Sequence, residues 1–169
     1  MLASFIQDLR QPEYVHVLIN PLPVYGLAIG VLGLIMALLL RSRRAQIATL
    51  VLIVLCGALA WPVGHYGEEG YDRALSLSDD QGQAWLKVHA HRADQFIGFF
   101  YALAAVAALA ILVPLKLPKA ALALTIVTLL LACAVLGMGG YIGYAGGKIR
   151  HREFRNAPAP PVPVEQDEP

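Results

Sequence analysis

The chain has 169 residues, of which 57% are hydrophobic and only 15% are charged. About a quarter of the residues of a soluble domain are usually charged, because its whole surface must be solvated. The composition therefore excludes an ordinary soluble domain, whereas the net charge of +1 excludes nothing by itself.

The chain opens with residues 1–20, which we predict to be an interfacial segment. Its apolar side chains stand among polar neighbours, and Tyr14 suits the level of the lipid headgroups. The segment lacks a basic start followed by an apolar stretch, so we do not expect a secretory signal.

Four apolar runs follow, each close to the 20 residues that cross about 30 Å of hydrocarbon as a helix. The predicted spans are residues 21–40, 45–63, 96–115 and 120–145. The fold class that they predict is all-α, a bundle of four transmembrane helices that forms a membrane domain over residues 21–147.

A loop of residues 64–95 separates the second span from the third, and we expect a short helix around residues 68–77 within it. Ser78 is the predicted N-cap of the next helix, which should run unbroken into the third span. After the last span, residues 148–169 form a tail whose proline, alanine and acidic content predicts an extended strap.

The distribution of charge predicts the orientation. The two short links, residues 41–44 and 116–119, hold five basic residues and no acid, whereas all 12 acidic residues lie in the N-terminal segment, the loop or the tail. Short links rich in Lys and Arg stay in the cytoplasm. Both termini and the loop should therefore lie on the outer face of a bacterial inner membrane.

All five histidines fall on that predicted outer side. Helix phase places His89 on a largely apolar stripe with Trp85 and Arg92, and it places His91 on the opposite polar face. His65 ends the second span at a similar depth. Because bis-imidazole ligation of a b-type haem needs a histidine pair on neighbouring helices, His65 and His89, together with His16, are the candidate cofactor ligands.

The same cluster could instead hold Zn or Cu, since imidazoles and carboxylates are common ligands of both. A third interpretation is that interfacial histidines only bond to backbone groups or lipid headgroups. The candidate metal ligands are His16, His65, Glu68, Glu69, His89 and His91.

Glycine stripes mark two spans, the first at Gly26, Gly30 and Gly33 and the last at Gly139, Gly143 and Gly147. Small residues at this spacing favour close packing of helices. No nucleophile with an adjacent base can be named, so we expect no catalytic residue and no enzyme activity of the chain alone.

The sequence from His16 to Gly26 resembles the opening motif, His…Asn-His-Leu/Phe-Pro, of an uncharacterised family of small four-helix bacterial inner-membrane proteins. The resemblance covers residues 14–115 and includes Trp61-Pro62-Val63 and Gly67-Glu68-Glu69. It carries over to His16, Asn20, Pro23, Gly26, Gly67, Glu68 and either His89 or His91. Pro21 stands where the second family histidine would be, and no Glu follows His89 or His91.

These observations predict an accessory or electron-transfer membrane subunit with a haem or metal site in the histidine cluster. The alternative is a cofactor-free structural subunit that docks onto a larger membrane complex through its outer loop and tail. Besides those subunits, the expected partner is the lipid bilayer and not nucleic acid, because Arg150, Arg152 and Arg155 suit interfacial anchors. Ion transport is disfavoured, since no ionisable residue lies within the hydrocarbon portion of a span.

Overall fold

The computed structural model describes residues 2–163, with side chains from Phe5 onward. Met1 and residues 164–169, the last part of the predicted tail, lie outside the described residues. The α-helices are α1 (Leu2–Asp8), α2 (Pro12–Ile19), α3 (Pro21–Leu39), α4 (Arg43–Ala58), α5 (Ala60–Glu69), α6 (Tyr71–Ser76), α7 (Asp80–Leu112) and α8 (Ala121–Arg150). Three short 3-10 turns cover Val113–Leu115, Pro118–Ala120 and Arg152–Phe154.

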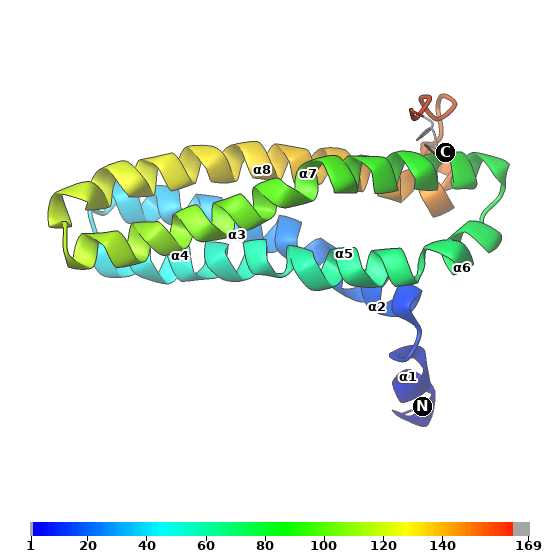
Figure 1. Cartoon of the computed structure of the whole chain (residues 1–169), viewed down its shortest axis with the longest axis horizontal. Helices are drawn as coiled ribbons and strands as arrows, with labels where there is room; N and C mark the ends of the chain where they lie inside the picture. The colour runs from blue at the N-terminus through cyan, green and yellow to red at the C-terminus, as the bar shows by residue number, and fades with distance from the viewer. Residues whose placement is uncertain (1, 164–169) are drawn as a thin grey trace, which may run out of the picture.

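The long helices form an elongated bundle, as Figure 1 shows. Helix α3 packs on α4, α4 on α7, α7 on α8 and α8 on α3, so the four neighbours close a ring. The predicted all-α fold with four long apolar helices is confirmed. We call the end with α6 and both chain termini the terminal end, and the opposite end, with the two short links, the hairpin end.

Large apolar side chains cover the outside of the bundle as well as its core. Leu32, Leu39 and Leu130 are each about two-thirds exposed or more, at 66%, 72% and 66%. Exposing such an apolar surface to water over the whole length of the bundle would be unfavourable, whereas contact with lipid is favourable. With four helices long and apolar enough to cross a bilayer, the chain is a multi-pass membrane protein.

The first glycine stripe packs as predicted. A Cβ on Gly26 would lie 2.5 Å from Cys56 Sγ, and a Cβ on Gly30 would lie 2.9 Å from the Ile53 side chain. Because these two positions of α3 have no side chain, α4 can approach closely. Around this contact lies the core, whose fully buried members include Leu27, Leu34, Leu50, Ile53, Leu103 and Val135.

A network of hydrogen bonds from Arg43 connects the helices at the hairpin end. Arg43 donates to the carbonyl of Ala110 at 2.7 Å, to Thr125 Oγ1 at 3.3 Å and to Gln46 Oε1 at 3.3 Å. Its guanidinium therefore ties α4 to α7 and α8 where buried polar groups need partners.

The loop expected over residues 64–95 is mostly helical. Helix α5 extends the second span to Glu69, and α7 begins at Asp80 and runs 33 residues without a break, as predicted. At about 1.5 Å per residue α7 is roughly 50 Å long, so part of it must project beyond the hydrocarbon. Its N-cap is Asp79 and not Ser78, because the Asp79 carboxylate accepts a hydrogen bond from the Gly82 N–H at 2.8 Å.

The N-terminal segment also differs from the expectation. Helix α2 packs against α5, and one turn residue, Asn20, separates it from α3. Pro21 opens α3 at a position where its missing N–H costs nothing. The predicted interfacial segment therefore supplies a helix to the bundle at the terminal end (Figure 1).

Candidate functional site

His16 is held against the second span by its own helix. Its Nδ1 lies 2.8 Å from the carbonyl oxygen of Val63 in α5. Gly67, one turn further along α5, makes room for the ring, because a Cβ there would lie 3.0 Å from His16 Cε1 and Nδ1. The packing of α2 on α5 thus fixes both the place and the orientation of this imidazole.

His89 is held in the same way by the last helix. Its Nδ1 lies 3.0 Å from the carbonyl oxygen of Ile142 in α8. Gly146, again four residues further along, faces the ring, and a Cβ there would lie 3.1 Å from His89 Nδ1. Two glycines on two helices therefore accommodate two imidazoles by the same arrangement.

The two rings form a pair at the terminal end. Their centres lie 6.2 Å apart and their planes are nearly perpendicular, at 81°. A carbonyl oxygen can only accept a hydrogen bond, so each Nδ1 must carry the proton. In the neutral rings both Nε2 atoms then keep a free lone pair, which is the tautomer that metal-ligating histidines use.

His65, which we expected to face His89, lies elsewhere. Its ring stacks on Trp61 with centres 5.5 Å apart, and its Nε2 lies 3.5 Å from Glu69 Oε1. Its side chain is 45% exposed. The ring that lies edge-on to His89 belongs to His16 instead.

The remaining predicted ligands do not join the pair. Glu68 is exposed, and His91 is half-buried. Within residues 2–163, no three His, Cys, Asp or Glu side chains come together as a metal site. The six candidate metal ligands therefore do not converge on one point, and two of them, His16 and His89, form the site that the structure brings together.

Residues that position this pair were only partly foreseen. Gly67 belongs to the stretch that resembles the four-helix family, but Gly146 stands outside the marked glycine stripe. The Val63 and Ile142 carbonyls carry no sequence signature at all. In both cases a glycine follows, by four residues, the residue whose carbonyl bonds to the histidine. This spacing can be recognised only once the packing of α2 on α5 is known.

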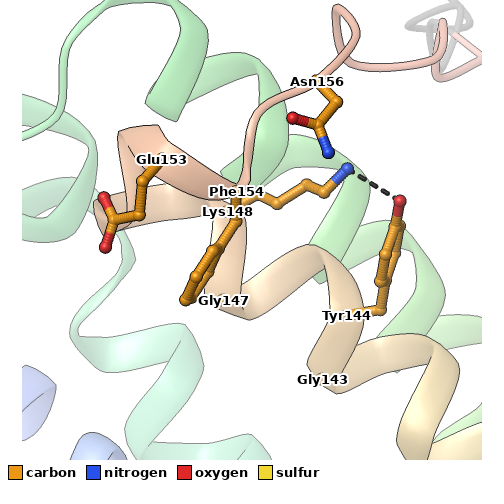
Figure 2. A pocket seen from close by; sticks show the side chains of 7 residues that line it. All are labelled: Gly143, Tyr144, Gly147, Lys148, Glu153, Phe154 and Asn156. Atoms are coloured by element: carbon orange, nitrogen blue, oxygen red, sulfur yellow. Dashed lines mark hydrogen bonds between the residues drawn. The ribbon is translucent and has the colours of Figure 1, made fainter.

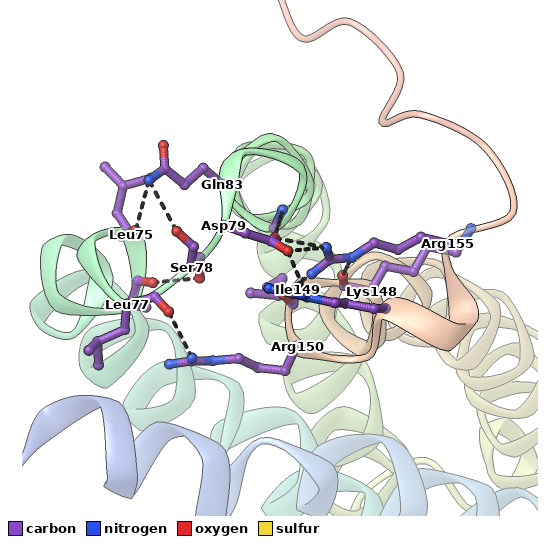
Figure 3. A network of polar contacts seen from close by, with 12 residues as sticks. Leu75, Leu77, Ser78, Asp79, Gln83, Lys148, Ile149, Arg150 and Arg155 are labelled. Atoms are coloured by element: carbon purple, nitrogen blue, oxygen red, sulfur yellow. Dashed lines mark hydrogen bonds and ion pairs between the residues drawn. The ribbon is translucent and has the colours of Figure 1, made fainter.

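Also at the terminal end, the C-terminal tail is clamped onto the start of α7 (Figure 3). Arg155 Nη1 lies 2.8 Å from Asp79 Oδ1, and Arg152 Nε lies 2.9 Å from Asp79 Oδ2. The Gly82 N–H first, and then Arg155, hold the pKa of Asp79 below its usual range. Beyond the clamp, Ala159 and Val162 pack on a small cluster formed by Trp85, Val88 and Ala145.

The tail also closes one side of a groove on α8, drawn in Figure 2. The groove is lined by Gly143, Tyr144, Gly147, Lys148, Glu153, Phe154 and Asn156. Glu153 bonds to His151 Nδ1 at 2.9 Å, and its own backbone N–H and this ring lower the pKa of its carboxyl.

Comparisons with protein-family models, with curated proteins and with solved structures find no match for this chain. The resemblance to the four-helix family stays a prediction, and the site is interpreted from its own geometry.

Proposed function

We propose that the chain is an accessory or electron-transfer subunit of a bacterial inner-membrane complex, in which His16 and His89 ligate a transition metal as an ion or as haem iron. The observation that carries the proposal is the pair of Nδ1 atoms held by backbone carbonyls. Such bonds orient an imidazole and raise the basicity of its Nε2.

Distance supports the proposal too. Imidazole nitrogens bind first-row metals at about 2.0 Å, so rings with centres roughly 6 Å apart would both reach one metal if their Nε2 atoms turned toward it. The observed separation is 6.2 Å. Haem iron would be held by the same two Nε2 atoms and would supply one-electron transfer.

The position of the pair in the bilayer fits an electron-transfer role at a membrane surface. Counting about 20 residues from the hairpin end of α7 reaches the region of Ala93, just short of His89. His89 therefore lies near the headgroup level. The basic short links at the opposite end favour a cytoplasmic hairpin end and an outer terminal end.

The test is the metal content and the reduced-minus-oxidised spectrum of the purified full-length protein. We expect bound metal, or a haem band, in the wild type and its loss in His16→Ala and His89→Ala. His65→Ala is the matched control, since it removes an imidazole at the same end and should leave the cofactor bound. Circular dichroism establishes that each variant is folded.

Two results would contradict this assignment. One is a wild-type protein, isolated from its own membrane, that carries neither stoichiometric metal nor haem. The other is a folded His16→Ala variant that keeps its full cofactor content.

The second candidate function is a cofactor-free subunit that docks onto a larger complex. It is favoured by exposed carboxylates at the terminal end, those of Glu68, Asp72 and Asp94. Replacing the three by their amides should reduce co-purification of the partner subunits from native membranes. Unchanged recovery of those subunits would count against docking through this surface.

A further inference from the structure

The groove on α8 has a floor without side chains. A Cβ on Gly143 or Gly147 would meet no atom of the described chain within 4 Å. Tyr144 and Phe154 stand beside this floor, and Figure 2 shows the Lys148 ammonium at the upper edge, near Tyr144 and Asn156. The groove is therefore open along the helix and carries a cation at one end.

Lys148 is buried without an anionic partner. It is 6% exposed, its Nζ donates to the Tyr144 hydroxyl at 2.7 Å, and Nζ lies 4.4 Å from the centre of the Trp85 ring. Across residues 2–163 no carboxylate pairs with it. Burying an ammonium is costly unless an anion or several acceptors compensate it, and Tyr144 satisfies one of its three N–H groups.

Trp85, which lies beside Lys148 but does not line the groove, also has an unpartnered donor in the described chain. Trp85 Nε1 is a buried donor with no hydrogen-bond partner in the described chain. Since the Tyr144 oxygen accepts from Lys148, the hydrogen of that hydroxyl is also free to donate. Among the described residues, this region therefore has more donors than acceptors.

The acid in the groove lining does not fill this role. Glu153 is 64% exposed and pairs with His151, and Figure 2 shows its carboxylate on the far side of Phe154 from the Lys148 ammonium. Arg152 and Arg155 of the same segment pair with Asp79, so Lys148 is the cation of the groove lining that has no carboxylate partner among the described residues.

The groove also lies where a lipid would reach it. It is at the terminal end of an apolar span, at the level that Tyr and Lys occupy in membrane proteins. On the hairpin side of the groove, Gly137 and Gly140 of α8 are exposed, and a Cβ on either would meet no described atom within 4 Å. An acyl chain could follow this glycine face away from the groove.

We propose that the groove binds the phosphate group of a phospholipid, with Lys148 as its counter-ion and the Tyr144 hydroxyl as a second donor, and with an acyl chain along the glycine face of α8. Phosphate oxygens are strong acceptors, and they suit an ammonium and a hydroxyl that have hydrogens left to donate. The site is separate from the His16–His89 pair, and the proposal does not depend on a cofactor there.

The test measures phosphatidylglycerol bound to the delipidated full-length protein by native mass spectrometry in detergent. We expect the wild type to retain the lipid and Lys148→Met to bind it about tenfold more weakly or worse, the loss expected for a charge-assisted hydrogen bond. Arg150→Met removes a nearby exposed charge of the same sign and should leave the affinity unchanged.

A second variant tests the proposal even if Lys148→Met does not fold. Gly147→Leu fills the floor of the groove on an open helix face and keeps every charge, so it should fold and still lose the lipid. Equal lipid binding by Gly147→Leu and the wild type would overturn the proposal, as would an equal loss in Arg150→Met. Inorganic phosphate that binds as tightly as the lipid would overturn the lipid assignment as well.

Discussion

Asp79 joins the start of α7 to the tail through one carboxylate. It caps α7 at the Gly82 N–H, and it pairs with Arg155 and Arg152 of the tail. Because these partners lower its folded pKa, its contribution to stability is fully present above the unfolded value of about 3.9. The contribution is lost as the pH falls through the folded pKa.

Asp79→Asn should therefore lower the Tm in detergent by a few degrees at pH 7, and the difference from wild type should shrink as the pH falls below 4. Asp80→Asn is the control, since Asp80 is exposed. A difference between Asp79→Asn and wild type that does not change between pH 7 and pH 3 would show that the charge of Asp79 is not what holds the clamp.

Arg43 holds the other end of the bundle. Arg43→Lys keeps the charge but loses the planar fork that reaches Ala110 and Thr125, so it should reduce the free energy of unfolding by about 1–3 kcal/mol. Arg44→Lys, at an exposed neighbouring position, should have no measurable effect. Denaturant titration in mixed micelles compares the two variants. Equal stabilities would refute the stabilising role of the Arg43 hydrogen bonds.

At this scale the sequence predicts residue types better than partners. Histidines at the terminal end and the inward turn of His89 follow from helix phase. The pairing of His89 with His16 and not His65 does not, because it depends on how α2 packs. The helical phase of the second span also cannot be continued past Leu59. At that residue α4 has ended, and a new helix, α5, begins with Pro62 in its first turn. Ser78 and Asp79 are both good N-caps, and the ion pairs with the tail distinguish them.

The contact between α4 and α7 depends on a glycine. A Cβ on Gly57 would lie 2.6 Å from the carbonyl oxygen of Phe100 and 2.9 Å from Ala104 Cβ. Backbone cannot yield as a flexible side chain can, so Gly57→Ala should force α4 away from α7 and cost about 1–3 kcal/mol.

Gly98→Ala is the matched control on α7, since a Cβ there would meet no described atom within 4 Å. It should be neutral or stabilise the protein by up to about 1 kcal/mol, the gain of alanine over glycine in a helix. Thermal unfolding of both variants in one detergent provides the comparison. A Gly57→Ala variant as stable as Gly98→Ala would contradict the close approach of α4 and α7.

Long apolar runs explain why the four main helices were predictable, since about 20 uncharged residues have few stable alternatives to a helix in lipid. The ends of the second and last helices at the terminal end were not, because these helices continue to Glu69 and Arg150, beyond the apolar runs that mark the spans. Short α2 was missed as a member of the bundle for a related reason: its eight residues are polar enough to suit an interface equally well.

The molecule as a whole separates its charges along the bundle axis. Cysteines introduced at Arg44 and Glu68, both exposed, in a Cys56→Ala, Cys133→Ala background should react with an impermeant maleimide from opposite sides of the membrane. The Glu68 position should be reached from outside intact cells, because short basic links favour a cytoplasmic hairpin end. Labelling of both positions from one side would refute the predicted topology.

The central proposal is that His16 and His89 ligate one metal. X-ray absorption of the protein isolated with its native metal counts those ligands directly. We predict two imidazole nitrogens at about 2.0 Å in the wild type, one fewer in His16→Ala and no change in His65→Ala. A metal shell without imidazole nitrogens, or one that loses a nitrogen in His65→Ala and none in His16→Ala, would contradict it.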